Sequence, residues 1–164
     1  MKDLDWSNLS FGYRQTDYNV RCYYRNGKWG EIEVCSDEYL KLHMAATCLH
    51  YGQEAFEGLK AYRCPDGKVR VFRMDENAAR LQSTCRGIMM PEVPTEMFEE
   101  MVKKVVRLNQ EWIPTYESGA TLYIRPLLIG TSAQVGVHPA TEYCFLIFVT
   151  PVGPYFKGGF SCND

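Results

Sequence analysis

The sequence predicts an α+β fold in which a mostly antiparallel sheet is accompanied by about two helices. Two tight-turn dipeptides, Asn26-Gly27 and Asp66-Gly67, lie between residues with high strand propensity and predict two hairpins. Between residues 75 and 112 the apolar residues recur at helical spacing, and after residue 120 they return to strand-like runs. Hairpins followed by helices and then by further strands are typical of α+β domains.

The hairpins occupy residues 18–34 and 60–73. Asn-Gly supplies the positive φ angles of a type I′ turn, which fits the first hairpin. In the second hairpin, Pro65 fixes φ ahead of Asp66-Gly67. Val69, Val71 and Arg73 then alternate with Arg70 and Phe72, which fits a strand with two distinct faces.

The helices are predicted at residues 75–88 and from about Thr95 to Trp112. Asp75 is the expected N-cap of the first, whose apolar positions are Ala78, Leu81, Cys85 and Ile88. The apolar stripe of the second consists of Phe98, Met101 or Val102, Val105, Leu108 and Trp112. Its pairs Glu99–Lys103 and Glu100–Lys104 indicate a solvated outer face.

Two further strands are predicted at residues 120–130 and 142–153. The second is nearly all apolar, which favours a central strand covered on both faces. The Gly- and Pro-rich residues 151–164 read as the beginning of a linker, so we expect a chain cut from a longer protein.

Composition excludes several function classes. The chain has 164 residues, of which 46% are hydrophobic, so it can bury the core of one domain. Lys and Arg total 18 against 20 Asp and Glu, a balance that favours neither nucleic acid nor an anionic membrane as partner. Seven dispersed cysteines, with no apolar leader, indicate reduced thiols in a cytoplasmic protein rather than zinc ligands or disulfides.

Tyr123 and Arg125 are the first candidate site residues. The period of a strand places both on one face, and a buried arginine is costly without a partner. Two interpretations stay open: Arg125 pairs with a carboxylate at a sheet edge, or the two residues line an anion site.

Arg80 and Glu57 are also ambiguous. Arg80 lies in the second turn of the predicted helix, where it is either an anion-binding group or an ordinary surface charge, as Arg86 and Arg107 are expected to be. Glu57, in the stretch Phe56-Glu57-Gly58, is either catalytic or, more commonly for such a turn, an acceptor for backbone donors. The three histidines lack the spacing of a metal site, so no metal is expected.

Five segments together resemble the branched-chain amino acid aminotransferases, which are pyridoxal-phosphate (PLP) enzymes of fold type IV. They are HYGQEAFEGLKAY (50–62), VRVFRMDENAARL (69–81), TLYIRPLLIG (121–130), VGV (135–137) and TPVGPYF (150–156). The resemblance runs in order from about Phe11 to Phe156. It implies that residues 1–156 form the small N-terminal domain of such an enzyme, that 157–164 begin the interdomain linker, and that Leu, Ile or Val and 2-oxoglutarate are substrates.

The resemblance also assigns residues. Arg80 matches the arginine that binds the PLP phosphate. Positions in or beside the substrate pocket are matched by Phe11, Tyr51, Phe56, Gly58, Tyr123, Arg125, Val137 and Tyr155. Within that set, Arg125 is placed to meet the distal carboxylate of glutamate. Tyr51 and Val137 match positions that reach into a neighbouring subunit's site, which implies a homodimer.

The chain departs from the family pattern at the lysine that forms the Schiff base with PLP. In the family this lysine lies in the second domain, after the linker, and none of the eight lysines of this chain has the matching context. We therefore expect no catalytic residue in this chain and no activity from it alone. A stand-alone binding or regulatory domain, or a sister enzyme such as D-amino acid aminotransferase or aminodeoxychorismate lyase, remains the alternative.

Overall fold

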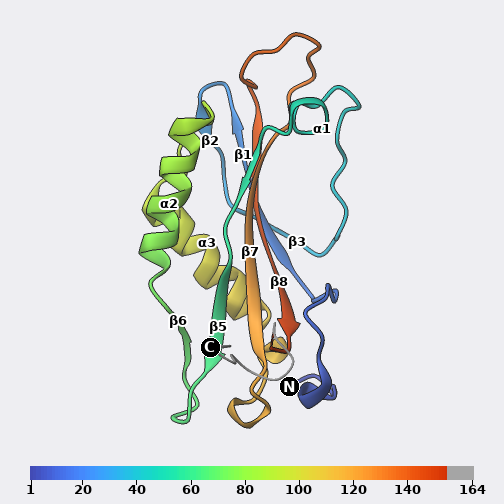
Figure 1. The fold of residues 1–164 in the computed structure, drawn as a ribbon, viewed down its shortest axis with the longest axis vertical. Helices are drawn as coiled ribbons and strands as arrows, with labels where there is room; N and C mark the ends of the chain where they lie inside the picture. Colours follow the sequence, from blue (N-terminus) through green and yellow to red (C-terminus); the bar gives the residue numbers. More distant parts are fainter. Residues whose placement is uncertain (155–164) are drawn as a thin grey trace, which may run out of the picture.

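The fold is the predicted α+β arrangement, seen in a computed structural model that describes residues 1–154 (Figure 1). Within that range one antiparallel sheet has the strand order β2-β1-β8-β7-β5-β6, with β3 also pairing with β1 and β4 with β7. The strands are β1 (Asn19–Arg25), β2 (Lys28–Trp29), β3 (Glu33–Cys35), β4 (Glu54–Phe56), β5 (Leu59–Arg63), β6 (Val69–Val71), β7 (Thr121–Gly130) and β8 (Tyr143–Val152).

Both predicted hairpins are confirmed. Asn26 and Gly27 have φ of 52° and 75°, and Arg25 pairs directly with Lys28 across them. In the second hairpin Gly67 has φ of 76°, and the Cys64 amide donates to the Lys68 carbonyl as the chain reverses. The strand expected after the first turn divides into β2 and β3, which both pair with β1.

The helices lie together on one face of the sheet (Figure 1). They are α2 (Met74–Gly87) and α3 (Thr95–Leu108), while a short α1 (Thr47–Tyr51) lies elsewhere and was not predicted. Single 3₁₀ turns occur at Trp6–Asn8, Gln110–Trp112 and Tyr116–Ser118. The core between helices and sheet includes Leu81, Phe98, Val105, Ile124, Phe145 and Ile147.

Three details of the predicted helices are wrong. Asp75 is not the N-cap, because Arg73 adopts a left-handed conformation (φ 43°) that starts the helix one residue earlier and leaves Asp75 in the first turn. Ile88 follows the last helical residue and is 41% exposed. Trp112 belongs to a separate 3₁₀ turn because α3 ends at Leu108.

The two long strands separate the faces of the sheet. β8 lies between β1 and β7 and is buried along nearly its whole length, as predicted for a central strand. In β7, Leu122, Ile124 and Leu128 face the helix-side core, whereas Tyr123 and Arg125 are half-buried on the opposite face. The first face holds the fold together, and the second is available for a site.

The N-terminal segment crosses this second face. The Thr150 hydroxyl accepts from the Arg14 amide at 2.8 Å and donates to the Arg14 carbonyl at 3.0 Å. The Tyr13 ring lies edge-on to Phe148, with ring centroids 5.9 Å apart. These contacts place Phe11 against Tyr123, near the start of β7.

No helix in the described part of the chain is long and apolar enough to cross a membrane.

Candidate functional site

The centre of the candidate site is an interruption in the pairing with β7. β4 ends at Phe56 opposite Leu127, and β5 begins at Leu59 opposite Ile124, so Glu57 and Gly58 lie between two strands. Glu57 is opposite Pro126, which has no N–H to donate to a ladder, and Gly58 is opposite Arg125. The Glu57 amide donates to the Pro126 carbonyl at 3.0 Å. The alternation of the strands continues across this interruption, so the Glu57 side chain is on the helix-side face, where it reaches α2.

Glu57 is a buried carboxylate held by two residues of α2. Its side chain is only 3% exposed, while that of Arg80 is 68% exposed. Arg80 Nε donates to Glu57 Oε1 at 2.9 Å and Arg80 Nη2 donates to Oε2 at 2.7 Å, a two-point ion pair. Asn77, one turn earlier, donates to Oε2 at 2.8 Å. These charge-assisted bonds compensate the burial of the carboxylate.

The same pair fixes the charge of Arg80. The hydrogen bonds that Arg80 donates to Glu57, and the negative charge of that carboxylate, raise the pKa of the Arg80 guanidinium further above its ordinary value. Arg80 is therefore a cation at neutral pH. Its Nη1 group has no hydrogen-bond partner among residues 1–154, so one edge of the exposed guanidinium remains free to bind an anion.

Tyr123 and Arg125 meet on the opposite face of the sheet. Arg125 donates from Nε and Nη2 to the Tyr123 hydroxyl, at 3.1 and 2.9 Å. Its guanidinium lies 4.4 Å from the centre of the Phe56 ring, a cation–π contact. Phe11 packs edge-on against Tyr123, with ring centroids 5.3 Å apart.

The edge-strand interpretation of Arg125 is wrong. β7 has β8 on one side and β4 and β5 on the other, so its backbone is paired on both sides. No carboxylate of residues 1–154 forms an ion pair with Arg125, whose contacts are a hydroxyl and two aromatic rings. A cavity of about 200 Å³ opens here, lined by Phe11, Gly12, Tyr13, Tyr123, Arg125, Phe148, Thr150 and Val152. A half-buried cation beside an aromatic cavity favours an anionic ligand that also carries apolar atoms.

Gly58 connects the two cationic groups. A Cβ at this position would lie 2.7 Å from the Tyr123 hydroxyl oxygen, so glycine is required for the close approach of β7. Asn77 Nδ2, which holds Glu57, also reaches the Gly58 carbonyl at 3.4 Å. The arrangement runs continuously from Arg80 through Glu57 and Gly58 to Tyr123.

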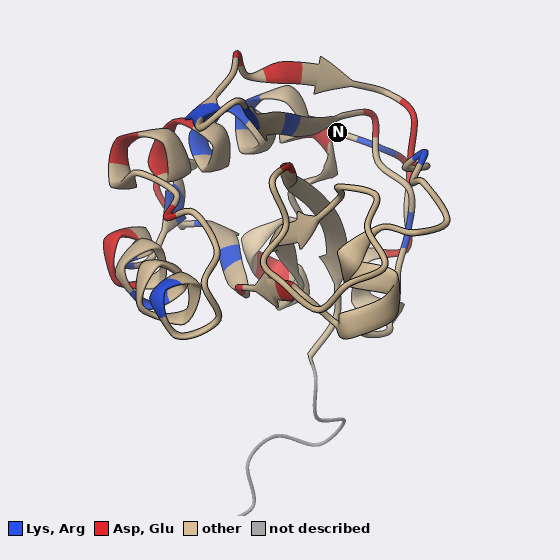
Figure 2. Cartoon of the chain, turned by 90° about the horizontal axis from the view of Figure 1, so that it is seen from above, with Lys and Arg blue, Asp and Glu red and all other residues tan. Residues whose placement is uncertain are grey.

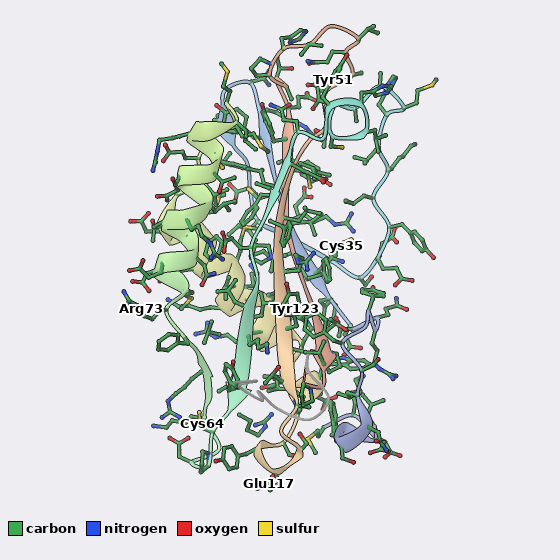
Figure 3. The ribbon with its side chains drawn as sticks, in the orientation of Figure 1. Cys35, Tyr51, Cys64, Arg73, Glu117 and Tyr123 are labelled. Carbon is green, nitrogen blue, oxygen red and sulfur yellow. The ribbon has the colours of Figure 1, made fainter. Side chains whose placement is uncertain are left out.

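Tyr51 and Val137 lie apart from this centre. In Figure 3 the labels of Tyr51 and Tyr123 are well separated along the length of the sheet. The Tyr51 hydroxyl donates to the Val135 carbonyl, which ties α1 to the loop between β7 and β8. Val137 is 85% exposed in that loop. Tyr155, the remaining predicted pocket residue, lies outside the described residues.

Reasoning from the sequence missed the partnership of Glu57. We weighed catalysis against the capping of backbone donors, and the side chain instead accepts from Arg80 and Asn77. Arg86 is a surface charge as predicted, paired with Glu92 at 2.9 Å. Within residues 1–154 no group of three or more His, Cys, Asp or Glu side chains could hold a metal ion.

Comparison with known proteins gives one consistent result. Over all 164 residues the chain is 52% identical to the branched-chain-amino-acid aminotransferase of Haemophilus influenzae, of which it covers 48%. It is 48% identical to that of Helicobacter pylori, with 97% of this chain and 47% of the relative covered. No protein-family model matches. The chain spans about half the length of the curated relatives it matches.

Solved structures agree on the fold. The Escherichia coli branched-chain amino acid aminotransferase matches with a TM-score of 0.68 and 27% identity, over 87% of this chain and 42% of that one. A second branched-chain amino acid aminotransferase, solved with pyridoxamine 5′-phosphate, matches with a TM-score of 0.60 and 27% identity, over 84% of this chain and 41% of that one.

Proposed function

The chain corresponds in sequence and fold to the N-terminal part of the branched-chain-amino-acid aminotransferases, and we propose that it forms one wall of the active site of such an enzyme. The complete protein would exchange an amino group between Leu, Ile or Val and 2-oxoglutarate with the help of PLP. The observation that carries this proposal is the 52% identity over the whole chain. The two cationic groups beside Gly58 give it a chemical basis.

Arg80 fits the phosphate of the cofactor. Its guanidinium is exposed, permanently charged and, among residues 1–154, free along the Nη1 edge, and a planar guanidinium is well suited to phosphate oxygens. When bound, PLP supplies an electron sink that stabilises negative charge at the substrate Cα. The contribution of Arg80 is to hold the cofactor in place by its phosphate.

The Tyr123 side of the site fits the substrate. The rings of Phe11, Phe56 and Tyr123 can bury an aliphatic side chain, which stabilises binding by about 25 cal/mol per Å² of apolar surface. Arg125, cationic and without a carboxylate partner among residues 1–154, can bind the distal carboxylate of glutamate. One pocket would thus accept both an apolar and an acidic side chain. Tyr155, by its resemblance to the family, would complete this lining.

The lysine that carries the cofactor would lie outside this chain. Among residues 1–154, Lys60 is the lysine to examine first, because it pairs directly with Tyr123 in the sheet and therefore lies on the same face. Others are remote from it: Lys103 pairs with Glu99 on α3, and Lys2 pairs with Asp17. Borohydride reduction of the PLP-loaded complete protein, followed by peptide mapping, tests this assignment. A PLP adduct on Lys60 would contradict it.

A homodimer would complete the site. Exposed apolar side chains gather on α1 and the loops around it, at Met44, Leu49, Tyr51, Val135 and Val137. Segments 42–53 and 131–141 contain no Asp, Glu, Lys or Arg. Figure 2, which views this end of the molecule, shows the charges on the helices and outer strands instead. An uncharged apolar surface of this kind favours contact with a second copy.

The cysteines support a cytoplasmic protein. Those within residues 1–154 are free thiols, and Cys22, Cys85 and Cys144 are buried as small core residues.

The direct test compares the complete protein with this chain alone. Each is incubated with PLP, leucine and 2-oxoglutarate, and glutamate formation is measured. We expect turnover by the complete protein and none by the chain alone. Turnover by the isolated chain would refute the proposed position of the catalytic lysine. A complete protein that binds PLP but accepts none of Leu, Ile and Val would favour a sister enzyme, and a protein that binds no PLP would favour a binding domain.

A matched pair of variants tests the pocket. Phe56→Ala in the complete protein should lower kcat/KM for leucine by about tenfold, because it removes the ring that covers Arg125 and lines the apolar wall. The affinity for PLP should stay unchanged. Tyr116→Ala, which truncates an aromatic residue 58% exposed in the turn Tyr116–Ser118, is the control and should leave both quantities unchanged. Equal loss of PLP binding and leucine turnover in Phe56→Ala would contradict the pocket role.

A further inference from the structure

We propose that Glu57 is a positioning residue that holds Arg80 in the orientation needed to bind the cofactor phosphate. This inference rests on the proposed function, because it assumes that Arg80 meets that phosphate. It assigns to this carboxylate a role that is exerted through Arg80.

The geometry of the ion pair carries the inference. Glu57 accepts from the Nε and Nη2 of Arg80, so it occupies one side of the guanidinium plane. The Nη1 edge points away from the carboxylate and has no partner among residues 1–154. An arginine held on one side by two bonds can present only its other edge to a ligand. The pair therefore fixes both the place and the direction of the free N–H groups.

The contrast in exposure shows why Arg80 needs such a partner. Its side chain is 68% exposed, and within residues 1–154 no contact besides the ion pair orients the guanidinium. An exposed arginine that is free to rotate loses substantial rotamer entropy when it binds a ligand. Glu57 is only 3% exposed, and it is anchored by Asn77 and by the hydrogen bond that its backbone N–H donates to the Pro126 carbonyl. The buried carboxylate is the fixed member of the pair, and its two hydrogen bonds restrict the orientation of the exposed Arg80 guanidinium.

The negative charge of Glu57 has an opposing effect. It repels a phosphate and partly neutralises Arg80. The Arg80 cation lies between this carboxylate and the free Nη1 edge, and water around the exposed guanidinium screens part of the repulsion. We therefore expect orientation to outweigh repulsion, and the sign of the effect of Glu57→Gln decides between them.

The positioning role of Glu57 must also be distinguished from a purely structural role in holding α2. Glu57 joins α2 to the interruption between β4 and β5, so its loss could simply loosen the helix. Gln82→Ala provides the matched control, because it removes the hydrogen bonds that tie α2 to Val93 and Thr95 while leaving the Arg80 pair intact. Arg86→Met removes an unrelated ion pair of α2.

The experiment measures the affinity of the complete protein, freed of cofactor, for pyridoxamine 5′-phosphate and for pyridoxamine. Both bind without a covalent bond to lysine, and the ratio of their affinities reports the contribution of the phosphate alone. Arg80→Met should reduce this ratio by about 100-fold. Glu57→Gln should reduce it by about tenfold. Gln82→Ala and Arg86→Met should change it by less than about twofold.

The double variant tests the coupling. If Glu57 acts only through Arg80, Glu57→Gln should have no further effect on the ratio once Arg80 is methionine. Glu57→Asp, which keeps the charge, should recover part of the loss seen with Glu57→Gln. Thermal unfolding of each variant identifies any that fails to fold.

Two results would overturn the inference, and they differ in meaning. A ratio unchanged or raised in Glu57→Gln, with Arg80→Met still impaired, would leave the phosphate role of Arg80 standing and reduce Glu57 to an anchor of α2. A ratio unchanged in Arg80→Met would refute the proposed phosphate site itself, and the role of Glu57 with it.

Discussion

The two members of the Glu57–Arg80 ion pair differ sharply in exposure to solvent. A surface ion pair contributes little to stability. Removing one member of a buried pair is strongly destabilising, because the other charge is left buried without a partner. The Glu57–Arg80 pair combines the two cases, since its carboxylate is buried and its guanidinium is exposed. Stability and ligand binding can therefore be separated at this pair by mutation.

Arg80→Met should destabilise the protein, because the buried Glu57 carboxylate loses the one cationic partner it has among residues 1–154. We expect a loss of about 2 kcal/mol in the free energy of unfolding, measured with urea. Glu57→Gln in the same chain should restore most of it, because the buried charge is gone. Arg86→Met, which breaks the exposed pair with Glu92, should cost less than about 0.5 kcal/mol. A double variant as unstable as Arg80→Met would show that packing, not charge, is lost.

Gly58→Ala should displace Tyr123. The new methyl group would lie 2.7 Å from the Tyr123 hydroxyl oxygen, so the ring must shift, which disturbs the hydrogen bonds that Arg125 donates to this hydroxyl. We expect a cost of about 1–3 kcal/mol in urea unfolding. Tyr123→Phe in the same chain removes the clashing oxygen and should recover much of this loss.

Gly87→Ala is the control for this position. It adds a methyl group with no neighbour among residues 1–154 within 4 Å, near the end of α2, and should not destabilise. If Tyr123→Phe fails to rescue Gly58→Ala, the close approach of these two residues does not set the cost.

At the scale of elements, Asn109 joins the N-terminal segment to the end of α3. Its side chain is fully buried, and its Oδ1 accepts from the amides of Asp17 and Tyr18. Its Nδ2 donates to the carbonyls of Tyr18 and Val105, so all four hydrogen-bonding positions of the amide are used. By binding residues 17 and 18, Asn109 fixes the C-terminal end of the segment that carries Phe11 to the site.

Asn109→Ala should destabilise the protein by about 2–4 kcal/mol, because buried backbone groups lose their partners. Hydrogen exchange should show the amides of residues 14–18 becoming unprotected before those of β7. Asn8→Ala, an exposed asparagine that donates to Asp5, is the control and should have little effect. Equal effects of the two substitutions would contradict the role of Asn109.

The β5–β6 hairpin has its own pH dependence. Arg70 donates to Asp66 at 2.9 and 2.7 Å, and this bonding, with the amide of Lys68, lowers the pKa of Asp66 from 3.8 to about 2. Because the folded-state pKa is depressed, the stabilisation from this pair is present above about pH 4 and is lost as the pH falls toward about 2.

Arg70→Gln should return the pKa of Asp66 toward 3.8, as measured by NMR titration of its carboxyl carbon. Asp5, whose pKa is lowered by hydrogen bonds from Ser7 and Asn8, should be unaffected. An Asp66 pKa that stays near its depressed value in Arg70→Gln would assign the shift to the turn backbone.

The elements that the sequence predicts well are those specified by neighbouring residues. Asn26-Gly27 and Asp66-Gly67 determine their turns locally, and the period of two places Tyr123 and Arg125 on one face. Whether β7 is an edge or an interior strand depends on the strand order, which involves residues 54–63 and 143–152. The Glu57–Arg80 pair joins residues 23 positions apart in different elements, so no local pattern could reveal it. The five residues of α1 are too few for a helical period to appear.

At the scale of the whole molecule, charge is distributed unevenly along the sheet. The end formed by α1 and the loop between β7 and β8 is apolar and uncharged, while the other end carries the turn with Glu117 (Figure 3). If the apolar end contacts a second copy, a buried lysine there would be costly, whereas a lysine at the opposite end would stay in water.

Val137→Lys should therefore weaken self-association of the complete protein by at least about tenfold, as measured by sedimentation at several concentrations. Val137 is 85% exposed here, so the lysine itself should not disturb the fold of one copy. Tyr116→Lys, at a 58% exposed aromatic residue in the turn at the opposite end, is the matched control and should leave the dissociation constant unchanged. Because Tyr51 and Val137 are proposed to complete the neighbouring site, leucine turnover should fall with the dimer fraction. Unchanged association in Val137→Lys would place the contact between copies elsewhere on the molecule.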